Sequence, residues 1–150
     1  MFFSETDLSD FIEENDVKFI RMTFCDTFGN MKNIAIMPRE LHHAITDGIP
    51  FNATGLLEAS HQNLLLKPDT STLSILPWRP QSGRVVRFFC KLYCMDGTPY
   101  EGDLRRNLRE TMKSIQKQGY QCEMGTRCEF YLFETDMAGK PTRIPCDQGG

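Results

Sequence analysis

The sequence has no excess of basic residues and no long apolar run. Lysine and arginine number 17 against 20 aspartate and glutamate residues, which gives a formal net charge of −3. Basic residues that are scattered and outnumbered do not form the patch that a nucleic acid requires. The N-terminus MFFSETDLSD has no basic region, and no segment approaches the ~20 apolar residues of a membrane span. We therefore expect a cytoplasmic protein with no nucleic-acid or membrane partner.

Two motifs of common functional sites are also missing. The six cysteines form no C-x-x-C pair, which argues against a zinc site. Five of the six lie in or beside strand-like runs, so we expect buried free thiols in a reducing compartment. No glycine-rich phosphate loop is visible, and the sequence therefore reveals no nucleotide site of its own.

Helical and strand-like patterns alternate at the start of the chain. Ser4 and Asp7 are candidate N-cap residues of a short helix that ends near Asn15. The run VKFIRMTFCDTFGNMKNIAIM then predicts two strands joined by the turn DTFGN, a hairpin with a short loop. A second helix is expected over 38–47, with proline at its first position and Gly48 after its last residue.

The middle of the chain predicts three more strands. Two short strands are expected over 64–66 and 72–76, on either side of a Lys-Pro-Asp turn. A long strand over 84–94 follows the loop PWRPQSG. With the preceding hairpin and helix, these strands predict an α+β architecture in which a helix lies across a mixed sheet, the arrangement called a β-grasp.

A turn signal after the long strand divides the chain into two parts. The linker MDGTPYEGD carries Asp-Gly and proline, which favour a turn. We therefore predict a β-grasp domain over residues 1–98 and a second unit over 99–150. A chain of 150 residues has room for one small domain plus part of another.

The second unit is predicted to open with a helix over 104–118, capped by Asp103 and ended by Gly119. A strand-like run and a strand over 142–146 follow it. One helix and one hairpin cannot bury their apolar faces alone, so we expect them to pack on the first domain or on a second chain. The apolar stripe of the helix contains Leu104, Leu108, Thr111, Met112 and Ile115.

The run CEMGTRCEFYLFE, residues 122–134, is the most strand-like in the chain. Side chains alternate between the two faces of a strand, so Arg127 and Glu129 are predicted to lie side by side on one face. The other face is predicted to be the core face. It holds Cys128, Phe130 and Leu132.

Part of this run, GTRCEFYLF, resembles the glutamine synthetase strand usually written G-x-E-x-E-F-x-x-F, whose two glutamates hold divalent metals. The order and approximate spacing of further segments are similar to the start of bacterial glutamine synthetases. These segments are VKFIRMTFCDTFGNMKNIAI, DTSTLSILPWRP and RVVRFFCKLYCMDGTPYEGDLR. The resemblance covers nearly all of the chain and implies a β-grasp domain followed by the helix and hairpin that begin a catalytic domain, which would be incomplete here.

The resemblance also implies a chemistry. Glutamine synthetases phosphorylate the side-chain carboxylate of glutamate with ATP and let ammonia displace the phosphate, with Mg²⁺ or Mn²⁺ neutralising the phosphates. Glu129 matches the second glutamate of the motif, and Arg127 stands in place of the first. A guanidinium about 4 Å from a divalent ion costs on the order of several kcal/mol at an effective dielectric of about 20. Two interpretations stay open: Glu129 is a metal ligand, or it forms an ion pair with Arg127 where the metal would lie.

A second position departs from the family pattern. The family has a loop resembling M-F-D-G-S-S that reaches into the neighbouring subunit's active site, where its aspartate helps to bind and deprotonate ammonium. This chain has PFNATG, with Asn52 at the position of the aspartate. An amide is neutral and a very poor base, so Asn52 cannot take the proton. Later in this loop, His61 is best interpreted as a solvated side chain.

Two functions of different classes follow from the resemblance. In the first, the chain is the N-terminal portion of a glutamine synthetase-like ligase, inactive as an isolated chain and binding neither ATP nor the metal by itself. In the second, it is a non-catalytic relative, a pseudoenzyme that acts as an interaction or regulatory module. Both imply self-association or contact with other glutamine synthetase-like subunits.

Overall fold

The computed structural model describes residues 5–57, 63–78 and 83–146. Within these ranges no helix combines the length and the apolar composition of a membrane span. Two 3₁₀ turns, η1 and η2, accompany the helices and strands. The elements are α1 (Glu5–Glu14), β1 (Val17–Cys25), β2 (Met31–Ile36), η1 (Pro38–Glu40), α2 (Leu41–Thr46), β3 (Ile49–Asn52), β4 (Asn63–Pro68), η2 (Thr70–Thr72), β5 (Ser74–Ile75), β6 (Arg84–Cys94), α3 (Leu104–Lys117), β7 (Phe133–Thr135) and β8 (Pro141–Pro145).

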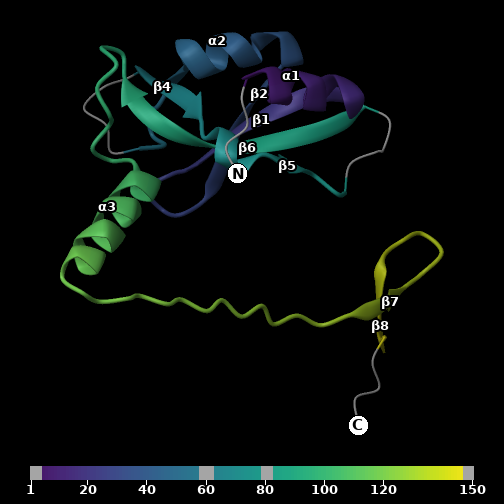
Figure 1. Cartoon of the computed structure of the whole chain (residues 1–150). Coiled ribbons are helices and arrows are strands. Elements are labelled where there is room, and N and C mark those ends of the chain that lie inside the picture. Colours follow the sequence, from purple (N-terminus) through teal and green to yellow (C-terminus); the bar gives the residue numbers. More distant parts are fainter. Residues whose placement is uncertain (1–4, 58–62, 79–82, 147–150) are drawn as a thin grey trace.

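The long strand β6 is the centre of the main sheet. The strand order is β2-β1-β6-β4-β3, and β5 also pairs with β6. β1 runs parallel to β6, with Ile20 opposite Val86, whereas β4 and β5 run antiparallel to it. With 11 residues, β6 is long enough to pair with β1 along one edge and with β5 and then β4 along the other (Figure 1).

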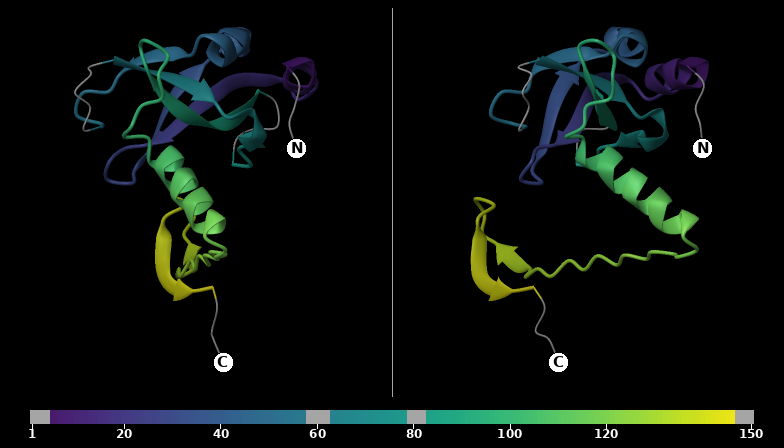
Figure 2. Two further views of the ribbon diagram at one scale, coloured as in Figure 1. Left: turned by 60° about the vertical axis from the view of Figure 1, so that its left-hand side comes forward. Right: turned by 90° about the vertical axis from the view of Figure 1, so that its left-hand side faces the viewer.

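The core lies between this sheet and the helices α1 and α2, which cover the same face of it (Figures 1 and 2). From Val86 to Tyr93 the side chains of β6 alternate between a buried and a half-buried face, as a sheet covered on one side requires. Burying an apolar side chain contributes about 1.5–3 kcal/mol, so the covered face supplies most of the stability. It carries Val86, Phe88, Cys90 and Leu92, and the opposite face carries Arg87, Phe89, Lys91 and Tyr93.

Several predicted elements are present where the sequence places them. The hairpin of β1 and β2 is confirmed, and its turn contains Gly29 at φ +81°. The helix predicted over 38–47 is present as η1 followed by α2, and Gly48 follows it at φ +90°. The long strand and the helix capped by Asp103 also form. The resulting mixed sheet crossed by a helix is the expected α+β arrangement.

Three predictions for the first half of the chain differ from the structure. The segment around Asn52, predicted as a loop, begins with the edge strand β3, which pairs with β4. Only the last part of the strand predicted over 72–76 forms, because residues 70–72 adopt the 3₁₀ turn η2. Asp7 lies inside α1 instead of capping it, and Ser4 lies outside the described residues.

The prediction of a strand over 122–134 is wrong for most of that range. Residues 120–132 have no regular secondary structure, and only Phe133–Thr135 pairs with another strand, as β7 of the β7–β8 hairpin. A strand requires a hydrogen-bonded partner, and among the described residues none is paired with this run before Leu132, whose carbonyl accepts from the N–H of Cys146 (Figures 1 and 2). The predicted core face is therefore exposed, including Phe130 at 70% of its surface.

The same exposure bears on two further expectations. α3 has no buried residue, so its apolar stripe does not pack into the core of the first domain, and packing on a second chain stays a prediction. Buried thiols were also expected, and Cys90 is buried. That expectation is wrong for three cysteines, because their segments do not pack against the core: Cys122, Cys128 and Cys146.

Candidate functional site

The first candidate site residue, Asn52, lies at the end of the edge strand β3. Its strand neighbour Phe51 is buried, and the Phe51 ring lies 4.9 Å from that of Phe24 in β1, which fixes β3 against the core. The side chain of Asn52 is exposed. Its amide oxygen accepts a hydrogen bond from the backbone N–H of Thr54 at 2.9 Å. The amide is thus oriented locally, with its NH₂ group directed to other partners.

Asn52 borders a cavity of about 470 Å³ on this side of the protein. The described residues that line it comprise five apolar or aromatic side chains, two amides and one lysine, and none is a carboxylate or a histidine. Amides and a lysine at neutral pH can donate hydrogen bonds, but none of them is a general base. The lining is therefore suited to binding and not to proton abstraction. It consists of Phe24, Met31, Lys32, Asn33, Ile34, Phe51, Asn52 and Leu56.

The turn between β1 and β2 supports this cavity. The Asp26 carboxylate accepts hydrogen bonds from the backbone N–H groups of Phe28 and Asn30, at 3.0 and 2.8 Å. Burial raises the pKa of Asp26, but the hydrogen bonds from Asn30 and Phe28 outweigh it and hold the pKa below its ordinary value. The turn is joined to the loop after β3, because the N–H of Thr27 donates to the carbonyl of Leu56 at 3.3 Å.

The second pair of candidate residues, Arg127 and Glu129, lies on the irregular segment 120–132. Both side chains are exposed. Within the described part of the chain they make no ion pair, and no three His, Cys, Asp or Glu side chains gather as metal ligands. The structure therefore does not bring Glu129 to Asn52, because this segment runs away from the sheet beyond α3 (Figure 2). His61 lies outside the described residues.

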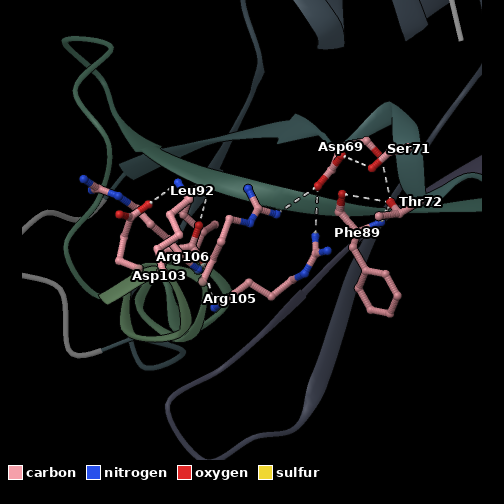
Figure 3. A network of polar contacts seen from close by, with 11 residues as sticks. Asp69, Ser71, Thr72, Phe89, Leu92, Asp103, Arg105 and Arg106 are labelled. Carbon is pink, nitrogen blue, oxygen red and sulfur yellow. Dashed lines mark hydrogen bonds and ion pairs between the residues drawn. The ribbon is translucent and has the colours of Figure 1, made fainter. Parts of the chain in front are cut away.

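A polar network between β6 and α3 was not predicted (Figure 3). The Asp103 carboxylate accepts a hydrogen bond from the N–H of Leu92 in β6 at 3.0 Å, in addition to capping α3. Nearby, the Asp69 carboxylate lies 3.5 Å from Arg105 and 3.2 Å from Arg109. Burial raises the pKa of Asp69, but a hydrogen bond from Ser71 and the charges around it outweigh that effect and lower the pKa.

One signal in the sequence points to this network. Arg105, Arg109 and Lys113 recur at intervals of four residues, so they form one basic face along α3. That spacing can be read from the sequence. The position of Asp69, which is 36 residues before Arg105 in the chain, cannot, because it depends on how η2 is placed against β6.

Comparison with known proteins identifies the family. Residues 16–95 match the family described as "Glutamine synthetase, beta-Grasp domain". The chain belongs to the glutamine synthetase family. It is 38% identical to glutamine synthetase from Clostridium saccharobutylicum over 151 residues, which is 99% of this chain and 34% of that protein. It is also 38% identical to glutamine synthetase from Methanosarcina mazei, over 98% of this chain and 34% of that protein.

Solved glutamine synthetase structures have the same fold. The Plasmodium falciparum enzyme superposes with a TM-score of 0.67 at 19% identity, over 79% of this chain and 24% of that one. The predicted family and the predicted β-grasp fold are thus confirmed. The chain spans about one third of the length of the curated relatives it matches.

Proposed function

We propose that the chain is the N-terminal portion of an ATP-dependent ligase that joins ammonia to glutamate, and that it is inactive in isolation. The observation that supports this most is identity of 38% along 99% of the chain to a glutamine synthetase of which it matches only 34%. ATP and Mg²⁺ or Mn²⁺ would then be bound largely by residues that lie outside this chain. The free thiols favour a reducing, cytoplasmic location.

The chemistry of two positions supports inactivity of the isolated chain. Asn52 presents an amide where the family resemblance implies an aspartate, and an amide cannot accept a proton from ammonium. Glu129 and Arg127 are both exposed, and no cluster of three or more His, Cys, Asp or Glu side chains forms a metal site among the described residues. The described residues alone therefore do not fit a divalent metal, and Glu129 would act as a ligand only with groups from outside the chain.

A chimera tests the proposed function. This chain replaces the matched N-terminal third of the C. saccharobutylicum glutamine synthetase, and glutamine formation from ATP, glutamate and ammonium is followed by mass spectrometry. We expect no glutamine from the isolated 150-residue chain and measurable glutamine from a chimera carrying Asn52→Asp and Arg127→Glu. The chimera with the natural residues should be at least about 100-fold slower, because it lacks the general base and one metal ligand.

Asn63→Asp is the matched control, since Asn63 is paired with Asn52 on the adjacent strand and is also exposed. This substitution adds the same charge without restoring the aspartate, so it should not raise the rate. If a chimera with both restoring substitutions assembles like the parent enzyme, as judged by light scattering, but forms no glutamine, the ligase proposal fails. Glutamine formation by the isolated chain would overturn the proposed inactivity.

Metal binding is tested separately by Mn²⁺ titration followed by electron paramagnetic resonance. We expect no saturable binding to the isolated chain, and we expect Arg127→Glu to introduce weak binding because it places a second carboxylate next to Glu129. Saturable Mn²⁺ binding to the unaltered chain that is lost in Glu129→Gln would contradict this expectation.

A second candidate function, an interaction module, is favoured by the exposed apolar stripe of α3. Leu104 and Leu108 are both exposed on this helix, and such a surface tends to mark a contact with another protein. In this function the chain docks on glutamine synthetase-like subunits or on its own copies. Sedimentation of the chain with and without the C. saccharobutylicum enzyme tests it: co-sedimentation that Leu108→Glu abolishes would support docking, and independent sedimentation would reject it.

A further inference from the structure

A small cavity of about 190 Å³ lies between β6 and the first three turns of α3. It is distinct from the cavity at Asn52, with which it shares no lining residue. Five basic side chains face it, against two carboxylates, although the whole chain carries a net negative charge. The basic residues are Lys91, Arg105, Arg106, Arg109 and Lys113, and the acidic ones are Asp103 and Glu110.

Both carboxylates of the lining are already engaged. The Asp103 carboxylate is buried and accepts hydrogen bonds from the backbone N–H groups of Leu92, Arg105 and Arg106. Glu110 forms an ion pair with Lys113 at 3.0 Å, which lowers the pKa of Glu110. The charge of Arg106 also lowers the pKa of Glu110, so this carboxylate is shared between Lys113 and Arg106, and the lining keeps an excess of positive charge.

Asp69, just outside the cavity, compensates only part of the positive charge. A single oxygen of its carboxylate serves both Arg105 and Arg109, at 3.5 and 3.2 Å (Figure 3). In the described part of the chain, the side chains of Lys91 and Arg106 form no ion pair or hydrogen bond. Lys91 is half-buried on the central strand. The charge of Lys91 also helps to lower the pKa of Asp69, so one carboxylate is shared by Lys91, Arg105 and Arg109 and cannot neutralise all three.

We propose that this cavity binds a phosphate-class oxyanion, either free phosphate or a terminal phosphoryl group. The site does not use the N-terminal N–H groups of α3, because Asp103 occupies them. Binding depends instead on side chains that converge from a strand and from a helix. Guanidinium groups bind phosphate oxygens through short, charge-assisted hydrogen bonds, and a lysine adds a point charge.

The size and the shape of the cavity define the ligand class. A volume of about 190 Å³ is smaller than the roughly 300 Å³ at which pockets for whole small molecules begin. It suits a single anionic group. Donors from β6 and from successive turns of α3 approach from several directions, which matches a tetrahedral dianion better than a planar monovalent carboxylate. This inference does not depend on the proposed ligase function.

Calorimetric titration of the 150-residue chain with inorganic phosphate, at fixed ionic strength in a phosphate-free buffer, tests the proposal. We expect saturable binding that is weakened about tenfold by Lys91→Met and about tenfold by Arg106→Gln. The matched control is Lys117→Gln, which removes one positive charge from the same helix at a residue outside the cavity. The control should bind phosphate like the unaltered chain.

Three results would overturn the proposal. The first is the absence of saturable phosphate binding. The second is equal weakening in Lys117→Gln, which would show a general effect of net charge. The third is acetate binding as tight as phosphate binding, which would reject the phosphate class. Circular dichroism checks that each variant folds; if Lys91→Met does not, the exposed Arg106→Gln decides the outcome alone. A phosphorylated peptide titrated alongside distinguishes a phosphoryl group from free phosphate.

Discussion

The carboxylate of Asp103 connects the central strand to the helix that follows it. One oxygen accepts a hydrogen bond from Leu92 of β6, and the other accepts from Arg105 and Arg106 at the start of α3. Asp103 is only 4% exposed although its side chain is a carboxyl group. A buried carboxylate is tolerated when its acceptor positions are filled in this way. A single residue thus sets the direction in which α3 leaves the sheet.

We predict that Asp103→Ala lowers the free energy of unfolding by about 2 kcal/mol, because it removes a helix cap and leaves the N–H of Leu92 buried without a partner. Urea denaturation followed by circular dichroism measures this change. The control Asp10→Ala removes an exposed aspartate of α1 and should change the free energy by less than about 0.5 kcal/mol. Equal effects of the two substitutions would contradict the prediction.

Asp26 predicts a dependence of stability on pH. Its pKa is lower in the folded protein than its ordinary value, so it stabilises the fold above the unfolded pKa of about 4, and this contribution is lost as pH falls through the folded pKa. We expect Asp26→Asn to lower the free energy of unfolding at neutral pH. The difference from the unaltered chain should shrink between about pH 5 and pH 2, where Asp26 itself becomes neutral. A difference that is constant with pH, measured by urea denaturation, would refute this.

At the scale of elements, β6 and α3 differ in how much of their surface is buried. β6 alternates a fully buried face with a half-buried one, because it has strands on both edges and helices over one face. α3 has a strongly amphipathic sequence, yet all of its residues remain outside the core. An apolar stripe predicts that a helix has a packing partner, but it does not identify the partner. In this structure no residue of α3 is buried against the other described elements.

We predict that Leu108→Gln changes the free energy of unfolding by less than about 0.5 kcal/mol, because glutamine has a similar helix propensity and Leu108 is 53% exposed. Leu66→Ala in β4 is the comparison, since Leu66 is fully buried. Its loss leaves a cavity and should cost about 2–5 kcal/mol. Urea denaturation of both variants tests the contrast. A loss above about 1 kcal/mol in Leu108→Gln would place the stripe in a packed interface.

At the scale of the whole molecule, stability is concentrated in the β-grasp. The hydrophobic core includes residues from Leu8 to Tyr100, so the linker after β6 contributes one aromatic side chain to it. The residues after Asp103 are held mainly through the junction at Asp103 and the ion pairs of Asp69. The β7–β8 hairpin forms a separate two-stranded sheet. Isolated hairpins of this kind are marginal in water.

We therefore predict that a protein shortened to residues 1–118 keeps the free energy of unfolding of the full chain to within about 0.5 kcal/mol. It retains the core, Asp103 and α3, and removes only segments that bury no described residue. Urea denaturation of the two proteins provides the measurement. A clear loss of stability in the shortened protein would mean that residues 119–150 pack on the β-grasp in solution.

Much of the fold could be predicted because its signals are local. The turn DTFGN, the proline and glycine around α2, and the cap at Asp103 act through hydrogen bonds and dihedral angles within a few residues. They are present in the structure as predicted. The family resemblance also comes from short motifs in a fixed order, which is why it could be recognised before the fold was known.

The predictions that were wrong share a different cause. β3 has only four residues and is a strand because β4 lies beside it. The run 122–134 has a stronger strand pattern, yet most of it forms no strand because no strand of the described residues pairs with it before Phe133. Whether Arg127 and Glu129 share a pocket likewise depends on the packing of that segment. A strand pattern expresses a propensity, and pairing depends on residues far away in the sequence.

The sequence by itself determined the family, the helices and the turns, because each is a matter of residue identity and near neighbours. The tertiary structure alone decided the central position of β6, the edge strand β3 and the exposure of α3. It also brought Asp69 and Lys91 to the basic face of α3. These features depend on contacts between segments distant in the chain, whose geometry is set by the sheet and its core and not by any local pattern.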